Sequence, residues 1–328
     1  MRLAVTGSIA TDHLATFPGK FSEQLIPGQL ERISLSFLVD DLQVRRGGVA
    51  ANIAIGLGRL GLDPLLVGAA GIDFAEYRQW LDVNGVDTGP VRVSETLHSA
   101  RFVCTTDADQ NQIATFYTGA MAEARHIALE PIARRAGGLE LVVVAPNDPE
   151  AMLRHTDECR SRGYEFVADP SQQLARLDRE QTRRLVDGAR FLFTNEYEAG
   201  LLQERSGWSE REILARVGTW VTTLGPDGAL IAEEGRPEQR VACVPTAAPA
   251  DPTGVGDAFR SGFLAGVLWR WPHERAARLG CAMATVVLES VGTQEYKLSA
   301  ADLLFRIEQA YGATAASEIA TRLVEADV

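Results

Sequence analysis

Short apolar runs alternate with segments of helical period along the chain. Within each run the valine, leucine and phenylalanine positions are nearly continuous, which is typical of strands buried on both faces. Because helical segments separate the runs, they predict crossovers between parallel strands and an α/β fold: a mostly parallel central sheet covered by helices on both faces. The predicted strands are residues 3–6, 64–67, 141–145, 166–168, 191–194 and 220–224, and residues 251–309 are mainly helical.

Two insertions have the period-two pattern of half-buried strands instead. Ile33, Leu35, Phe37 and Val39 occupy alternate positions, and residues 101–105 and 113–117 form two strand-like runs around the turn at 107–109. The insertions, at about 14–45 and 98–119, therefore predict a small β-sheet lid that projects from a single α/β domain spanning 1–328. The edge of the predicted strand at 33–39 would allow a second lid to pair with it, which favours a homodimer.

Composition and charge narrow the classes of partner. With 328 residues, 46% hydrophobic and 23% charged, the chain resembles an average globular protein that buries a full core. Its net charge of −12 repels a phosphate backbone, so we expect no nucleic acid polymer as a partner. The N-terminal residues lack a signal-peptide pattern and no run reaches 18 apolar residues. We therefore expect a cytoplasmic protein with no membrane partner.

A glycine-rich segment at 251–259 precedes a helical run. The backbone N–H groups of Gly254, Val255 and Gly256 would form an anion site at the start of that helix. Asp257 either complements the dipole of its own helix or acts as a base. A carboxylate beside an anion site is electrostatically unfavourable, which favours a base that meets a phosphoryl acceptor.

Three further segments have both a local and a functional interpretation. Gly47 and Gly48 open a helix that contains Asn52, either as a tight loop or as a turn that approaches a sugar. Asn195 and Glu198 have the spacing of a capping box. The glycines at 223–228 suit a proline-containing turn.

The order of these motifs resembles the ribokinase-like (PfkB-type) family of carbohydrate and nucleoside kinases, from Val5 to about Gln309. Within that family, residues 6–13, 37–42 and 169–177 resemble bacterial-type adenosine kinases. The family usually has threonine and alanine where this chain has Pro252 and Val255, and both departures keep the backbone donors and Asp257.

The resemblance implies an adenosine kinase of purine salvage, which transfers the γ-phosphate of ATP to the 5′-hydroxyl of adenosine and gives AMP. Asp257 would be the catalytic base, and Gly254, Val255 and Gly256 would stabilise the transferring phosphoryl group. The resemblance further implies ATP-binding by Asn195, Thr223, Gly225, Gly228 and Gly256, a water-mediated Mg²⁺ contact of Glu198, and a possible K⁺ site at Asp251.

For the acceptor, the resemblance implies that Asp12, Gly48 and Asn52 hold the ribose hydroxyls. Phe102 and Phe116 would stack on the base, although the two rings can equally pack the core of the lid. The full set of expected substrate-binding residues is Ser8, Asp12, Ser36, Gly48, Asn52, Phe102, Phe116, Gln172, Gln173 and Arg176.

Other classes of protein use parts of this pattern. A ribokinase- or fructokinase-type sugar kinase would share Asp257 but leave the lid aromatics without a base. A non-catalytic nucleoside-binding module has no need for a base beside an anion site. A dehydrogenase is disfavoured because residues 7–12 lack the glycine spacing of a pyrophosphate turn.

Overall fold

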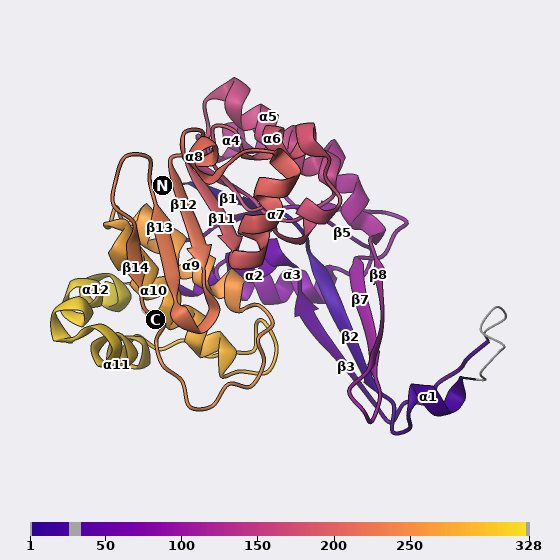
Figure 1. Ribbon diagram of the computed structural model, residues 1–328. Helices are drawn as coiled ribbons and strands as arrows, with labels where there is room; N and C mark the ends of the chain where they lie inside the picture. The colour runs from indigo at the N-terminus through magenta and orange to yellow at the C-terminus, as the bar shows by residue number, and fades with distance from the viewer. Residues whose placement is uncertain (1, 26–33, 326–328) are drawn as a thin grey trace.

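The computed structural model describes residues 2–25 and 34–325, and Figure 1 shows a body with a projecting arm. Within those residues an eight-stranded sheet has the order β14-β13-β12-β11-β10-β9-β1-β4. The strands from β4 to β12 pair in parallel, and β13 and β14 continue the sheet in antiparallel pairing. The predicted fold is confirmed. The strands are β1 (Leu3–Thr6), β4 (Leu65–Val67), β9 (Leu141–Val144), β10 (Glu165–Ala168), β11 (Phe191–Asn195), β12 (Thr219–Thr223), β13 (Ala229–Ala232) and β14 (Gln239–Val241).

Successive residues of each strand contribute to two different cores. Leu3 and Val5 belong to one buried cluster and Ala4 to the other, on the opposite face of the sheet. The continuous apolar runs follow from this two-sided burial, because both faces of the strand exclude water.

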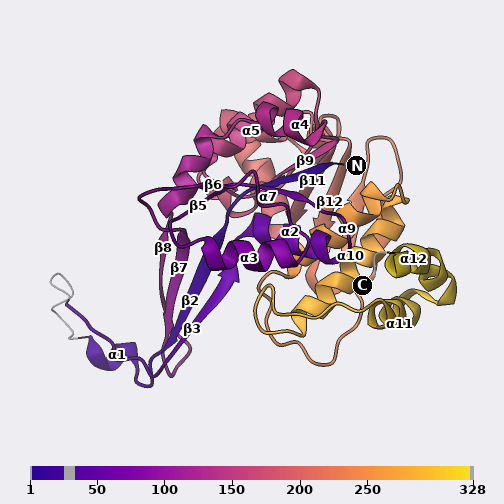
Figure 2. The same cartoon turned by 180° about the vertical axis from the view of Figure 1, so that it is seen from behind.

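Helices cover both faces of the sheet, as the two opposite views show (Figures 1 and 2). Among the described residues no helix combines the length and the apolar character that crossing a membrane requires. One face is covered by α2 (Val49–Arg59), α3 (Ala75–Val83), α9 (Val255–Leu268), α10 (His273–Leu288), α11 (Ala300–Tyr311) and α12 (Ala313–Glu325). The other face is covered by α4 (Leu129–Ala136), α5 (Pro149–Arg162), α6 (Arg179–Val186), α7 (Glu196–Ser206) and α8 (Glu210–Leu214).

The projecting arm is the lid. Its strands are β2 (Ala10–Thr16), β3 (Asp41–Gly47), β7 (Ala100–Thr106) and β8 (Gln112–Tyr117), in the order β3-β2-β7-β8. Beyond them lies the short helix α1 (Phe21–Gln24), and a small pair, β5 (Ala69–Ala70) and β6 (Arg92–Val93), connects the lid to the body. Phe102 of β7 pairs directly with Phe116 of β8, so both rings lie on one face of the lid.

The lid differs from the sequence-based prediction in two respects. The strand predicted at 33–39 is wrong for the described part of that segment, because residues 34–39 form no strand; Ile33 lies outside the described residues. Phe37 instead packs its ring against the rings of Phe17 and Phe21. An apolar position in this alternating sequence is therefore covered by ring contacts, without sheet pairing. In addition, β2 already begins at Ala10, before the start predicted for the lid.

The carboxyl ends of the parallel strands meet at one edge of the sheet. Loops that begin after Thr6, Val144, Ala168 and Thr223 therefore lie near one another, on the edge where open α/β sheets bind ligands.

Candidate active site

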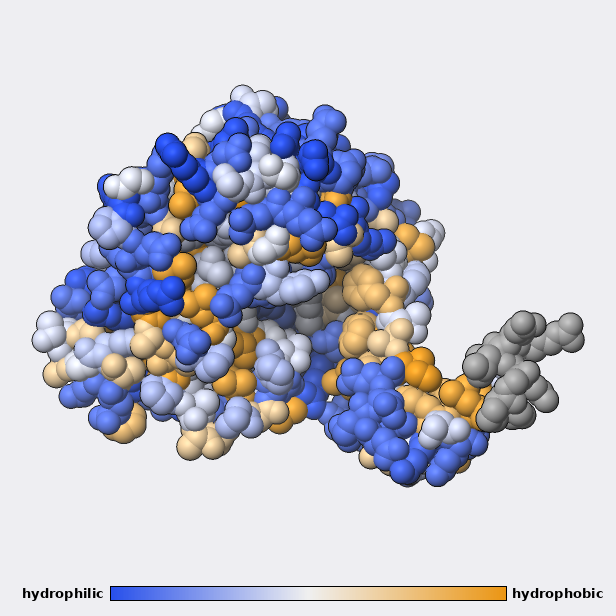
Figure 3. Space-filling model, viewed as in Figure 1, coloured by the Kyte–Doolittle hydropathy of each residue, from blue (hydrophilic) through white to orange (hydrophobic). Residues whose placement is uncertain are grey.

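Two cavities lie at this edge of the sheet. The first has a volume of about 540 Å³ and lies between the lid and the body, where the molecular surface is hollowed (Figure 3). Of the residues predicted to bind the acceptor, this cavity is lined by Ser8, Asp12, Gly48, Asn52, Phe102, Phe116, Gln172, Gln173 and Arg176. We call it the acceptor cavity.

Ser36 is an exception among the predicted residues. It is exposed on the segment that precedes β3 and does not line the acceptor cavity. The ring of Phe37, next to Ser36, packs against Phe21 of α1, and α1 lies at the tip of the lid (Figure 1). This contact holds the segment with Ser36 near the tip. The structure therefore gives Ser36 no contact with an acceptor bound within the same chain.

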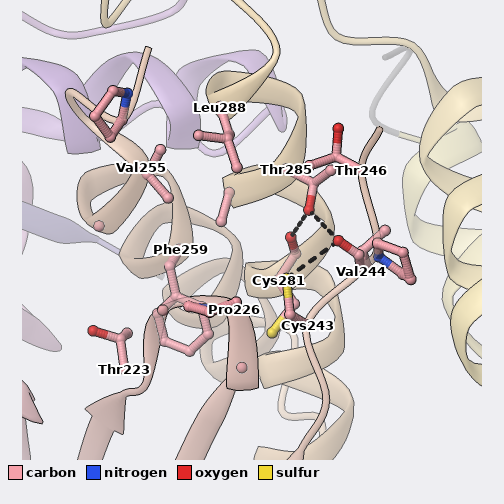
Figure 4. Close-up of a pocket in the computed structure, with 16 residues that line it drawn as sticks. Thr223, Pro226, Cys243, Val244, Thr246, Val255, Phe259, Cys281, Thr285 and Leu288 are labelled. Carbon is pink, nitrogen blue, oxygen red and sulfur yellow. Dashed lines mark hydrogen bonds between the residues drawn. The ribbon is translucent and has the colours of Figure 1, made fainter. Parts of the chain in front are cut away.

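The second cavity has a volume of about 590 Å³ and lies on the other side of the start of α9 (Figure 4). Of the five residues predicted to bind ATP, Asn195 does not line it, and the other four do: Thr223, Gly225, Gly228 and Gly256. Its inner wall is apolar and includes residues that the sequence did not indicate: Cys243, Val244, Phe259, Cys281, Ala284 and Leu288. We call it the nucleotide cavity.

The two cavities share a single loop. Pro252, Val255 and Gly256 face the nucleotide cavity, whereas Gly254 and Asp257 face the acceptor cavity. Gly254 has φ +78°, and a Cβ atom there would lie 2.9 Å from Cγ2 of Thr293. Only glycine fits this position without strain, so the loop can present the backbone N–H groups at the start of α9 between the cavities.

Asp257 lies in the first turn of α9, half-buried in the acceptor cavity. Burial raises the pKa of Asp257 to about 7, although Arg260 and a hydrogen bond from Asn52 oppose this effect. The Nδ2 atom of Asn52 donates to Oδ2 of Asp257 at 2.8 Å. A carboxyl group whose pKa lies near neutrality suits a general base.

A buried ion pair supports the turn that contains Asp257. Arg260, one turn further along α9, contacts both carboxylate oxygens of the fully buried Asp169, at 2.7 Å and 2.6 Å. Its Nη1 atom also donates to the carbonyl oxygen of Gly256. The pair could not be predicted from the sequence: 91 positions separate its members, and the stretch 169–177 that Asp169 opens gives no sign of Arg260 as its partner.

Asp12 and Ser8 lie where the lid joins the body. Burial raises the pKa of Asp12 to about 6, while Arg45 opposes the change. The Oγ atom of Ser8 accepts a hydrogen bond from the backbone N–H of Val49, at the start of α2. Asp12 therefore presents a carboxylate to the acceptor cavity, and Ser8 orders the glycine turn beside it.

The carboxylate of Asp251 already binds other groups of the protein, which disfavours the predicted K⁺ site. Its Oδ2 atom lies 3.6 Å from Nη1 of Arg45 and accepts a hydrogen bond from the N–H of Gly292. Its Oδ1 atom accepts from the N–H of Thr253. A guanidinium group already balances this carboxylate, so the residues present do not fit a monovalent cation on Asp251.

Glu198 forms a complete capping box with Asn195, so the local interpretation of this motif holds. One oxygen of Glu198 accepts from the N–H of Asn195 at 2.8 Å, and the other accepts from Oγ of Ser171 at 3.1 Å. In the described part of the chain no three acidic, histidine or cysteine residues form a direct metal cluster. A carboxylate with occupied oxygens fits a Mg²⁺ ion that keeps its waters and is held mainly by phosphates.

The fold and the site define a two-substrate phosphotransferase: a nucleotide cavity and an acceptor cavity that meet at a helix N-terminus beside a carboxylate. The family model of the pfkB family carbohydrate kinases matches residues 19–300. The chain belongs to this family, and the predicted kinase class is confirmed.

Several relatives carry the general name nucleoside kinase. That of Methanothermobacter thermautotrophicus is 33% identical over 76% of this chain and 80% of its own length, and that of Methanocaldococcus jannaschii is 29% identical over the same shares. The solved structure of Burkholderia thailandensis nucleoside kinase in complex with inosine has 35% identity and a TM-score of 0.82, over 94% of this chain and 98% of that chain. None of these names specifies adenosine, so the narrower resemblance stays a prediction.

Proposed function

We propose that the protein is a purine nucleoside kinase that transfers the γ-phosphate of ATP to the 5′-hydroxyl of its acceptor, with adenosine as the expected acceptor and AMP as the product. The observation that carries the proposal is the position of Asp257 on the acceptor side of a loop whose other side lines the nucleotide cavity. The names of the relatives support a nucleoside rather than a free sugar.

The acceptor cavity has separate parts for a ribose and a base. Asp12, Gly48 and Asn52 line it near the body, where carboxylate, amide and backbone groups suit ribose hydroxyls. Phe102 and Phe116 line it from the lid, as a pair of aromatic rings that suits a purine. A free sugar would leave these rings without a partner.

The reaction follows from the arrangement of these groups. Asp257 removes the proton of the 5′-hydroxyl as the new O–P bond forms and the bond between the γ-phosphorus and its bridging oxygen breaks. The N–H groups of Gly254, Val255 and Gly256 stabilise the charge on the transferring phosphoryl group. Mg²⁺, when bound, neutralises charge on the β- and γ-phosphates, and Glu198 orients its water shell.

The proposal includes a homodimer through the lid. Leu42, Val44, Val103 and Ile113 lie on one face of the lid by the strand register, with His13 and Ala15 of β2 between the first two and the last two, and they are 41–59% exposed. An exposed apolar face on a sheet with open edges is typical of an interface. Light scattering after gel filtration tests this: a monomeric mass at micromolar concentration contradicts it.

Phosphate transfer from ATP to a panel of acceptors tests the proposed function. The panel contains adenosine, inosine, guanosine, ribose and fructose, each compared by kcat/KM. We expect the purine nucleosides to exceed both sugars, with adenosine first. A preference for ribose or fructose identifies a sugar kinase instead, and inosine in first place refutes only the choice of adenosine.

A further inference from the structure

The segment after α10 lies against the acceptor cavity without supplying a predicted functional residue. Gln294 is fully buried there, and Thr293 is 6% exposed. Thr293 donates to the carbonyl oxygen of Arg46, and Tyr77 donates to that of Gly47, so the same region orders the glycine turn before α2. A buried glutamine in such a place needs partners for both ends of its amide.

Trp80 determines the orientation of the Gln294 side-chain amide, that is, the positions of its oxygen and nitrogen atoms. The indole Nε1 atom of Trp80 lies 3.1 Å from Oε1 of Gln294, and an indole N–H is only ever a donor. Oε1 must therefore be the acceptor at this end. The Nε2 atom then faces Oη of Tyr77 at 2.5 Å and Oδ1 of Asn52 at 2.8 Å, and donates to both.

The orientation of Gln294 in turn determines that of Asn52. Oδ1 of Asn52 accepts from Nε2 of Gln294 at 2.8 Å. Its Nδ2 atom then points to Oδ2 of Asp257 at 2.8 Å. A flipped Asn52 amide would place its oxygen against the carboxylate of Asp257 and its NH₂ group against the NH₂ group of Gln294, which costs both buried hydrogen bonds.

We infer that Gln294, oriented by Trp80, is a positioning residue that fixes the side-chain amide of Asn52 so that it donates to Asp257. The inference rests on the proposed function only in taking Asp257 as the base. Because Asn52 occupies Oδ2, the free Oδ1 atom of Asp257 receives the proton of the acceptor hydroxyl. Gln294 lines neither cavity and acts through Asn52.

Other charged and titratable groups also act on Asp257, from each element packed around it. Arg260 on α9 favours its ionised form, and Asp169 after β10 and Glu198 on α7 disfavour it. Tyr296, in the segment that contains Gln294, also interacts with it. A substitution at Gln294 leaves all four groups in place, so it isolates the contribution of the Asn52 hydrogen bond.

The test compares Gln294→Met with Trp80→Phe. Gln294→Met keeps the approximate shape of the side chain but removes both hydrogen-bonding ends. Trp80→Phe keeps an aromatic ring beneath Arg46 but removes the N–H group that orients Gln294, together with one of the two indole rings. Thr156→Val is the matched control, because Thr156 is also fully buried and hydrogen-bonded but lies on α5, away from the site.

For Gln294→Met we expect kcat to fall by about 10- to 100-fold, the range for losing a hydrogen bond to a charged group, with the nucleoside KM within about threefold of the parent. The acid limb of the pH profile should move to higher pH, because the lost bond favours ionised Asp257. Trp80→Phe should shift both quantities in the same direction by less, and Thr156→Val should lower only the melting temperature.

Titration of the Asp257 carboxyl carbon by NMR gives a readout that needs no turnover. An upward change in the pKa of Asp257 in Gln294→Met, absent in Thr156→Val, supports the positioning role even if the parent protein phosphorylates no nucleoside. A pKa and a kcat equal to those of the parent overturn the inference. A raised KM with unchanged kcat also overturns it, since it would show that Gln294 only shapes the cavity. If Gln294→Met does not fold, Trp80→Phe decides by the same two measurements.

Discussion

Replacing Asp257 with asparagine should weaken activity and increase stability together. The amide keeps the shape of the side chain but has no basicity, so we expect kcat to fall by ~10² or more. Binding of adenosine, measured directly, should stay within a few-fold of the parent. The stability effect comes from the pKa of Asp257, which burial raises from 3.8 to about 7.

The sign of the stability effect follows from this difference. The folded protein holds the proton more tightly than the unfolded chain, so ionising Asp257 costs folding free energy between pH 3.8 and 7, and the full cost is present above pH 7. A difference of about three pH units corresponds to at most ~4 kcal/mol, which solvent access to the half-buried side chain reduces. Asparagine removes the cost.

Urea unfolding at pH 5 and pH 8 measures the effect. The stability gained by Asp257→Asn should be larger at pH 8 than at pH 5 by about 1–2 kcal/mol, because part of the ionisation cost is absent at pH 5. Thr156→Val serves as the control, since it removes a buried hydrogen bond on α5, away from the site, and neither side chain titrates. An equal change in stability at both pH values, or turnover within threefold of the parent, refutes the reasoning about Asp257.

Four further substitutions test other parts of the site. Glu198→Gln should raise the Mg²⁺ concentration needed for half-maximal activity without lowering the melting temperature; an unchanged Mg²⁺ dependence removes Glu198 from the metal site. Phe102→Ala and Phe116→Ala should each raise the adenosine KM by roughly five- to 150-fold, the energy scale of base stacking, and leave phosphorylation of ribose unchanged. Equal losses for both acceptors would show that the rings hold the lid together. Gly254→Ala should reduce kcat by ~10² or more, because its Cβ atom clashes with Thr293 at a positive φ; wild-type activity of this variant contradicts the anion site.

The sequence predicts the central sheet well because burial on both faces leaves a local signal. Each parallel strand is a short apolar run, and the motifs at Thr223 and Asp257 follow such runs or open a helix. The proximity of the strands that carry Phe102 and Phe116 was also predictable, since a single turn separates them, whereas the register that pairs the two residues was not. Local sequence is informative here because the interacting residues are close along the chain.

The features that the sequence did not reveal depend on contacts between distant segments. Asp169 and Arg260 meet across 91 positions, and Gln294 reaches Asn52 across 242. Neither pair leaves a periodic pattern, and a buried glutamine looks like any other polar residue until its neighbours are known. For residues 34–39 the local pattern was misleading instead. Apolar and polar residues alternate there as in a strand, but Phe37 packs against Phe17 and Phe21 and no strand forms.

The position of the transferred phosphate tests the central claim most directly. ³¹P NMR of the product formed from ATP and adenosine distinguishes the 5′ oxygen from the 2′ and 3′ oxygens by coupling to the neighbouring protons, and 5′-deoxyadenosine is the matched control acceptor. We expect one phosphomonoester, coupled to the 5′ methylene protons, and no product from 5′-deoxyadenosine. A phosphate on a secondary hydroxyl, product from 5′-deoxyadenosine, or no transfer to any purine nucleoside would contradict the assignment of Asp257 and the acceptor cavity to 5′-phosphorylation.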